Sequence, residues 1–351
     1  MPHLLDPIDI GPVHLPNRVI MAPLTRLRGT VDHLPTDLQI EYYRQRASAG
    51  LIISEGTPIS PMGVGYAQVP GLWSPQQAEL WKPIVAAVHE AGGRIFAQIW
   101  HVGRVSHPMF LNGKLPVAPS AIAPAGNVSI VRPEVAFVTP HALTLDEIKH
   151  VIEEFRLGAQ YAKDAGFDGV EIHGANGYLL DQFLHSGSNL RTDEYGGSVE
   201  NRARFMLEVA DAAISVWGAD RVGMHLAPRG DVMSMSDPNP AEIFLHVARK
   251  LGERKLAFLL AREYEAPDWL GPQLKKAFGG VYIANEKFTQ ASADAAIERG
   301  DCDAVAFGKL FIANPDLPAR FAINADLNVP QSTTFYSHGA EGYVDYPKMN
   351  D

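Results

Sequence analysis

Eight short apolar runs separated by helical segments are the feature that most constrains how this chain can fold. Most of the runs are continuously apolar, as is expected for parallel strands that are covered on both faces. They occupy residues 18–24, 51–56, 94–100, 168–173, 221–227, 256–262, 280–284 and 303–308. Strand and helix therefore alternate eight times within 351 residues, and this predicts an α/β protein with a parallel sheet.

The segments between the runs carry recognisable helix starts. Thr36 and Thr144 each stand three residues before a Gln or Glu, which is the capping-box pattern. Ser74 repeats that pattern with proline at the first helical position, and Ser198 opens another helix. Further helices fit residues 240–251, 271–278, 289–299 and 315–323.

Two architectures accommodate such an alternation, an open doubly wound sheet and a closed barrel. A doubly wound sheet usually has fewer repeats and a glycine-rich fingerprint after its first strand, whereas no GxGxxG pattern follows Thr25. We therefore predict a (β/α)8 TIM barrel that forms one domain over residues 1–351. The proline-rich insertion 101–143 after the third strand is expected to form a lid or small subdomain, and residues 324–351 a C-terminal tail.

Composition excludes several kinds of partner. The formal net charge is −10 and the basic residues are scattered, which argues against nucleic acid and against an anionic membrane surface. No apolar run approaches the roughly 20 residues of a membrane-spanning helix. A single cysteine, Cys302, and the lack of a leader pattern in residues 1–6 predict a cytoplasmic protein. The oligomeric state is left open between a monomer and a homodimer.

The predicted strands end in polar or small residues rather than apolar ones. In a barrel these carboxyl ends meet at the face where active sites form. Any one of them could be a satisfied hydrogen-bonding residue, but the whole set at one mouth favours a polar, planar ligand. The set comprises Thr25, Gly56, Gln98, His173, His225, Arg262, Asn285 and Gly308.

The densest block of polar residues follows the fourth strand and runs from His173 to Phe205. This block closely resembles the signature stretch of the Old Yellow Enzyme family, and weaker matches extend the resemblance over essentially the whole chain. The residues that carry it include Pro23-Leu24-Thr25, Gln98, His173, Asn176, Tyr178, Asn189, Arg191, Tyr195, Arg202, Asn314-Pro315-Asp316-Leu317 and Glu341–Pro347.

The resemblance implies an FMN-dependent ene-reductase that takes hydride from NAD(P)H and reduces electron-poor alkenes such as enones and maleimides. Nitro compounds and nitrate esters are further acceptors of some relatives. FMN is expected to be bound tightly but non-covalently, and no metal is expected.

The same resemblance assigns catalytic roles to three residues. His173 and Asn176 would donate hydrogen bonds to the carbonyl oxygen, where negative charge grows during reduction. Tyr178 would give a proton to the α-carbon, because a phenol of pKa about 10 is protonated at neutral pH. The alternative is a purely structural role, in which His173 and Asn176 only shape a turn and Tyr178 is an aromatic residue of the core.

The remaining site residues are expected around the flavin and the substrate. Thr25 would contact the flavin O4, Gln98 the pyrimidine edge, and Gly56 would leave room for the ring. The full cofactor-binding set is Pro23, Leu24, Thr25, Gly56, Gln98, His225, Ala284, Asn285, Gly308 and Lys309. Tyr66, Trp100 and Tyr336 join His173 and Asn176 as expected substrate-binding residues.

Two positions depart from the commonest family pattern. Relatives usually have arginine where this chain has His225 and Lys309. Lysine keeps a point charge for phosphate but loses the bidentate fork of arginine. Arg262, at the next strand end, is the other cation that could stand near flavin N1, and the sequence leaves the choice between His225 and Arg262 open.

Other readings remain to be weighed. Relatives with an iron–sulfur cluster need several cysteines, which a single Cys302 excludes. An aldolase-type barrel would need a lysine at a strand end, and a metal hydrolase a His/carboxylate cluster at ligand spacing. A non-catalytic flavin-binding barrel stays possible in principle, although the intact set of His173, Asn176 and Tyr178 speaks against it.

Overall fold

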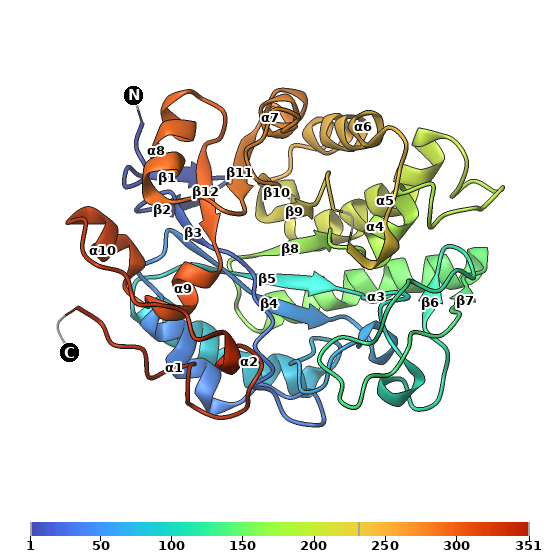
Figure 1. The fold of residues 1–351 in the computed structure, drawn as a ribbon, viewed down its shortest axis with the longest axis horizontal. Coiled ribbons are helices and arrows are strands. Elements are labelled where there is room, and N and C mark those ends of the chain that lie inside the picture. Colours follow the sequence, from blue (N-terminus) through green and yellow to red (C-terminus); the bar gives the residue numbers. More distant parts are fainter. Residues whose placement is uncertain (1, 231, 350–351) are drawn as a thin grey trace.

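Eight parallel strands close into a barrel in the computed structural model, which describes residues 2–230 and 232–349 (Figure 1). In chain order they are β3 (Val19–Met21), β4 (Leu51–Pro58), β5 (Ile95–Trp100), β8 (Gly169–Gly174), β9 (Val222–Leu226), β10 (Phe258–Arg262), β11 (Val281–Asn285) and β12 (Ala304–Phe307). Each strand pairs with the next, and β12 pairs with β3 to close the ring. The (β/α)8 barrel is confirmed, and each predicted run contains its strand to within about two residues.

Helices surround the barrel at the predicted places. They are α1 (Asp37–Gln45), α2 (Pro75–Glu90), α3 (Leu145–Asp164), α5 (Val199–Trp217), α6 (Pro240–Glu253), α7 (Gly271–Phe278), α8 (Gln290–Glu298) and α10 (Leu317–Ala322). Their starts follow the expected chemistry, because Ser74, Thr144 and Ser198 each accept a hydrogen bond from the backbone N–H three residues later. None of the helices among the described residues is long and apolar enough to cross a membrane.

The N-terminal end of the barrel is closed by a hairpin that the sequence did not reveal. Its strands are β1 (Ile8–Ile10) and β2 (Val13–Leu15), each only three residues long. Ile10 and Leu15 pack against the inward-facing rings of Phe96 and Phe258 in one apolar cluster. This cluster fills the lower half of the barrel.

The upper half of the barrel interior is polar. Every second residue of a strand faces inward, and the inward positions nearest the carboxyl ends are occupied by polar side chains. On β5, Phe96 belongs to the lower cluster, so Gln98 and Trp100 face the same interior nearer the carboxyl end. On β8 the same alternation directs Glu171 and His173 inward. The fold therefore gathers polar side chains at one mouth.

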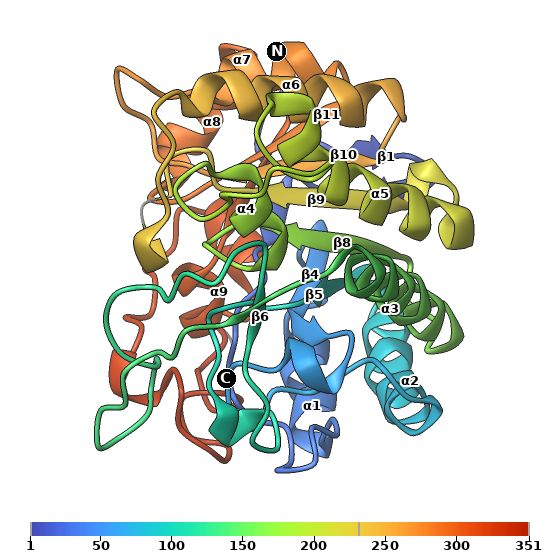
Figure 2. The same ribbon diagram turned by 90° about the vertical axis from the view of Figure 1, so that its right-hand side faces the viewer.

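Two segments outside the barrel, residues 101–143 and the C-terminal tail, lie near that mouth. Residues 101–143 contain η2 (Pro108–Phe110) and a parallel pair formed by β6 (Val117–Ala118) and β7 (His141–Ala142). Figures 1 and 2 show this segment in teal, on the side toward which the β4 and β5 arrowheads point. Arg104 donates to the carbonyl oxygen of Ile122 within the segment and to that of Met233 in the loop after β9, each at 3.0 Å, and the second bond ties the segment to that loop.

The C-terminal tail runs beside α1 (Figure 1), where Gln45 donates to the carbonyl oxygen of Val344 at 2.8 Å. Its last two residues, 350–351, lie outside the described residues, as do Met1 and Asp231. Two short helices were also missed, α4 (Leu179–Leu184) and α9 (Lys309–Ala313). The remaining single turns are η1 (Pro61–Gly63), η3 (Ala219–Arg221), η4 (Val232–Ser234) and η5 (Ser332–Thr334).

Candidate active site

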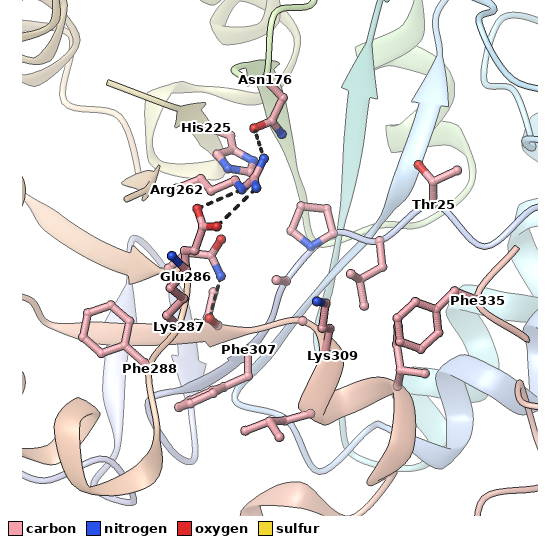
Figure 3. Close-up of a pocket in the computed structure, with 18 of the residues that line it drawn as sticks. Thr25, Asn176, His225, Arg262, Glu286, Lys287, Phe288, Phe307, Lys309 and Phe335 are labelled. Atoms are coloured by element: carbon pink, nitrogen blue, oxygen red, sulfur yellow. Dashed lines mark hydrogen bonds and ion pairs between the residues drawn. The ribbon is translucent and has the colours of Figure 1, made fainter. Parts of the chain in front are cut away.

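A cavity of about 560 Å³ opens at the carboxyl ends of the strands (Figure 3). Its volume lies within the range of small-molecule sites. Its walls come from the loops after β3, β8, β11 and β12, the strand ends of β9 and β10, and the C-terminal tail. Of the residues predicted from the sequence, it is lined by Pro23, Leu24, Thr25, Tyr66, Asn176, Tyr178, His225, Asn285, Gly308, Lys309 and Tyr336.

Four rings form a stacked row beside this cavity. Trp100 stacks on Tyr66 at a centroid distance of 5.8 Å and on His173 at 5.7 Å. His173 in turn stacks on His225 at 5.2 Å, and the three interplanar angles are 9°, 12° and 10°. Trp100 and His173 are buried behind the cavity surface, whereas Tyr66 and His225 line it. The row fixes the orientation of each ring in it.

Tyr178 stands edge-on to this row and reaches the cavity. Its ring lies 4.9 Å from that of Trp100 and 5.0 Å from that of His173, and its hydroxyl is 2.8 Å from the hydroxyl of Tyr66. The residue is the N-cap of α4, whose first N–H donates to the carbonyl oxygen of His101. Burial raises the pKa of Tyr178 well above its usual 10, so the phenol is protonated at neutral pH.

His173 is neutral, and its tautomer follows from a backbone contact. Burial, with a smaller contribution from the charge of Arg262, lowers the pKa of His173 to about 3. The backbone N–H of Ala175 donates to Nδ1 at 3.3 Å, so Nε2 carries the hydrogen. His173 therefore presents one N–H donor at Nε2.

Asn176 lines the cavity from a left-handed backbone position. Its φ is +59° and that of Gly177 is +77°, which turns the chain sharply between β8 and α4. Asparagine tolerates this conformation better than most residues. The side-chain Oδ1 accepts a hydrogen bond from Arg262 at 2.9 Å, and Figure 3 shows the amide nitrogen on the opposite side.

His225 belongs to a buried polar group beneath the cavity. Gln98 donates to Glu171 at 2.7 Å, and its Nε2 lies 3.4 Å from Nδ1 of His225. Burial lowers the pKa of His225 well below 6.5, so this imidazole is neutral at neutral pH. Burial also raises the pKa of Glu171 to about 8. Gln98 is buried and does not line the cavity, and Glu171 was not identified from the sequence.

Gly56 and Ala284 are two expected cofactor-binding residues that do not line the cavity. A Cβ added at Gly56 would lie 2.8 Å from the Trp100 ring, so the indole explains the glycine at this position. The expectation that Gly56 leaves room for a flavin stays a prediction. Ala284 is fully buried in the core between the barrel and the helices and does not line the cavity.

The loop after β11 also lines the cavity, with Glu286, Lys287 and Phe288. Glu286 and Lys287 both have positive φ, 91° and 61°. Non-glycine residues in this region are strained, and such strain is concentrated at functional sites. Lys287 and Lys309 both line the cavity (Figure 3).

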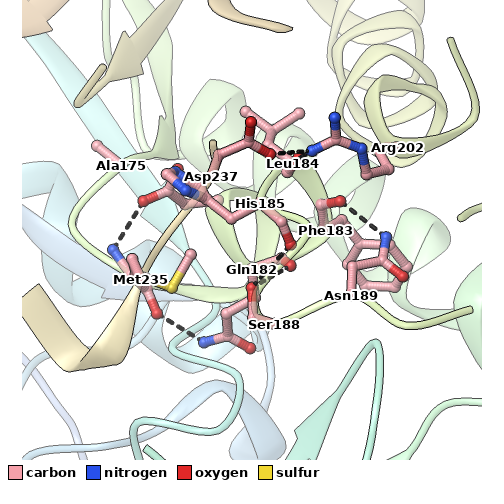
Figure 4. Close-up of polar contacts among 12 residues, drawn as sticks. Ala175, Gln182, Phe183, Leu184, His185, Ser188, Asn189, Arg202, Met235 and Asp237 are labelled. Atoms are coloured by element: carbon pink, nitrogen blue, oxygen red, sulfur yellow. Dashed lines mark hydrogen bonds and ion pairs between the residues drawn. The ribbon is translucent and has the colours of Figure 1, made fainter. Parts of the chain in front are cut away.

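Much of the block that carried the family resemblance is structural. Arg202 donates to the carbonyl oxygen of Leu184 and pairs with Asp237 (Figure 4). Asn189 donates to the carbonyl oxygens of Phe183 and Tyr195 at 2.8 Å each. These contacts fasten α4 and its neighbouring loops, and thereby hold Tyr178 in place.

The described residues fit an FMN better than a metal. Across residues 2–230 and 232–349 no group of three or more His, Cys, Asp or Glu side chains could hold a metal ion. His225 lines the cavity, and its Nε2 is buried without a hydrogen-bond partner among the described residues. A heteroaromatic edge would satisfy that donor, and the amino groups of Lys287 and Lys309 suit a phosphate.

Comparisons with known proteins agree over the whole chain. Residues 3–328 match the model of the NADH:flavin oxidoreductase / NADH oxidase family. A putative 12-oxophytodienoate reductase 11 of Oryza sativa subsp. japonica is 44% identical and is covered to 97%, with 98% of this chain matched.

Solved structures show the same likeness. An Old Yellow Enzyme homologue from Zymomonas mobilis superposes with a TM-score of 0.96 at 44% identity, covering 99% of both chains. Morphinone reductase in complex with tetrahydroNAD gives 0.95 at 48% identity, covering 99% of this chain and 98% of that one. The chain therefore belongs to the NADH:flavin oxidoreductase, or Old Yellow Enzyme, family and is an FMN-dependent oxidoreductase that uses a nicotinamide coenzyme.

Proposed function

We propose that this protein is an ene-reductase that reduces electron-poor alkenes such as enones and maleimides. The observation that carries the proposal is the placement of a protonated phenol, Tyr178, and an amide, Asn176, in one cavity. His173 stands against Tyr178 at 5.0 Å between ring centroids. One general acid beside two hydrogen-bond donors suits a substrate whose carbonyl oxygen gains charge while its α-carbon takes a proton.

The residues would divide the work as follows. FMN bound in the cavity would supply hydride, taken from NAD(P)H, to the β-carbon of the alkene. His173 through Nε2 and Asn176 through its amide nitrogen would hold the carbonyl oxygen. Tyr178 would deliver its proton to the α-carbon, and the Tyr66 hydroxyl at 2.8 Å would orient the phenol.

The cavity walls suggest how the cofactor is held. Thr25 and His225 would meet the ring, and Lys287 and Lys309 the phosphate. Glu286 also lines the cavity, but its carboxylate is paired with Arg262 at 3.1 Å and so repels an anion less. Gln98 would act from below the ring through His225.

We also propose that the chain forms a single domain and that residues 101–143 act as a lid over the barrel mouth. The tie between Arg104 and the loop after β9 supports a segment that covers the mouth. A cytoplasmic location, a monomeric or homodimeric state, and the absence of nucleic acid and membrane partners stay predictions.

Replacing Tyr178 by phenylalanine tests the proposal. Tyr178→Phe should slow alkene reduction by about 10²–10⁴-fold, the usual contribution of a general acid. Reduction of the flavin by coenzyme should change little, since that half-reaction needs no proton at the α-carbon. Stopped-flow absorbance separates the two half-reactions.

Tyr66→Phe is the matched control, because it removes the hydroxyl that bonds Tyr178 and leaves the proposed acid in place. It should slow alkene reduction far less than Tyr178→Phe. Equal slowing of both half-reactions by Tyr178→Phe, or of neither, would remove Tyr178 from the role of acid.

A further inference from the structure

Arg262 ends β10 and projects into the cavity between two other strand ends. Its side chain is about 40% exposed, and Figure 3 shows it between Asn176 and Glu286. It contacts a residue 86 positions away in the sequence, because β8 and β10 both pair with β9.

The contacts of Arg262 fix the direction of its guanidinium. Nε lies 3.1 Å from Oε2 of Glu286, and Nη2 donates to Oε1 of the same carboxylate at 3.2 Å. A planar guanidinium held by two parallel contacts to one carboxylate has little freedom to rotate. The remaining nitrogen, Nη1, then donates to Oδ1 of Asn176 at 2.9 Å.

That last bond determines how Asn176 can act. An amide whose oxygen already accepts from Arg262 must present its nitrogen elsewhere. Without Arg262 the amide could rotate by half a turn and offer its oxygen to a carbonyl oxygen, which would be repulsive. The arginine therefore selects the amide orientation in which Asn176 is a donor.

The charge of Arg262 also bears on the rest of the site. Its positive charge contributes to lowering the pKa of His173 and of His225, and it opposes the rise in the pKa of Tyr178. Both imidazoles are neutral, so the positive potential beside them comes from Arg262.

We propose that Arg262 is a positioning residue of the carbonyl-binding site, held by Glu286 and acting through Asn176. This inference rests on the proposed function and deepens it. It also assigns Arg262 to the substrate oxygen, and leaves the role expected beside flavin N1 to His225, which is buried with Gln98 and Glu171.

A double-mutant cycle on phenol binding tests the inference. 4-Chlorophenol is the probe, because a phenolate bound over oxidised flavin by the carbonyl-oxygen donors gives a long-wavelength absorbance band. Arg262→Met should weaken its binding about ten-fold, as loss of a charge-assisted contact does. In an Asn176→Ala background the same substitution should have almost no further effect, because the group it positions is gone.

Two further variants separate position from charge. Arg262→Lys keeps the charge but loses the fork, so it should bind the phenol nearly as weakly as Arg262→Met. Glu286→Gln frees the guanidinium and should weaken binding to a smaller degree. FMN content and thermal unfolding of each holoenzyme show whether a variant is folded.

Each other outcome has a definite meaning. A full effect of Arg262→Met in the Asn176→Ala background, or recovery of binding by Arg262→Lys, would overturn the inference and leave the proposed function standing. A wild-type holoenzyme that carries FMN but gives no band with 4-chlorophenol would overturn the proposed carbonyl site, and the inference with it.

Discussion

Glu171 shows how much the barrel interior changes an ordinary side chain. It is fully buried, and among the described residues its Oε1 has no hydrogen-bond partner, while Oε2 accepts from Gln98. Burial is the main cause that raises its pKa to about 8, from 4.5 in an exposed carboxyl group. Because His225 at 3.8 Å is neutral as well, the polar layer beneath the cavity carries little charge at neutral pH.

This predicts a pH dependence of stability that Glu171→Gln removes. Between pH 4.5 and about 8 the unfolded carboxyl group is ionised while the folded one keeps its proton. The folded state then binds more protons, so the free energy of unfolding falls as pH rises, by about 1.4 kcal/mol per pH unit. Below that window both states are protonated and the effect vanishes.

Urea unfolding of wild type and Glu171→Gln at pH 5, 6 and 7 checks this prediction. The variant should gain stability relative to wild type at each step upward in pH. A difference that stays constant across that range would mean that Glu171 is ionised in the folded protein.

For single residues, the sequence was sufficient to predict most of those that line the cavity, but not the contacts that they make with one another. Asn176, Tyr178, Lys309 and most other expected residues do line one cavity, because alternation along strands fixes which side chains face the mouth. The bond from Arg262 to Asn176 spans 86 positions and has no local signal.

The C-terminal tail is the element whose role was least visible beforehand. Arg28 donates to the carbonyl oxygens of Thr334, Phe335 and Glu341 within the tail. Tyr343 is fully buried and stacks on Tyr42 at 4.0 Å with an interplanar angle of 3°. The tail is thus fastened to the barrel, and this brings Phe335 and Tyr336 to the cavity.

Tyr343→Ala should therefore destabilise the protein by about 3–5 kcal/mol, the usual cost of deleting a buried aromatic ring. Its hydroxyl is buried without a partner among the described residues, so Tyr343→Phe should be nearly neutral. Tyr336→Ala, at a residue 47% exposed, should also change stability little. Chemical denaturation of the three variants gives the comparison, and equal losses in all of them would show that the tail is not docked through Tyr343.

Helix and strand positions were predictable where a cap or a long periodic run marked them. Helix α3 illustrates this, with Thr144 at its start and a buried stripe that includes Ile148 and Phe155. The hairpin β1–β2 and the six-residue α4 were missed because segments this short carry no periodic signal. Tertiary contacts, such as Leu179 N–H to the His101 carbonyl oxygen, form them instead.

For the whole molecule, the eightfold alternation of strand and helix was sufficient to predict the closed barrel. Closure in turn places residues as distant as Thr25 and Lys309 around one cavity. The substrate of that cavity depends on side-chain orientation, which the alternation does not encode. The ene-reductase account therefore stands on Tyr178, Asn176 and His173 acting together on one small molecule.

Anaerobic absorbance of the purified holoenzyme tests this account most directly. NADPH or NADH should bleach the oxidised flavin, and 2-cyclohexen-1-one should then restore its colour while one cyclohexanone forms per FMN. A colourless protein that takes up no FMN, or a reduced flavin that the enone leaves unoxidised, would contradict the account.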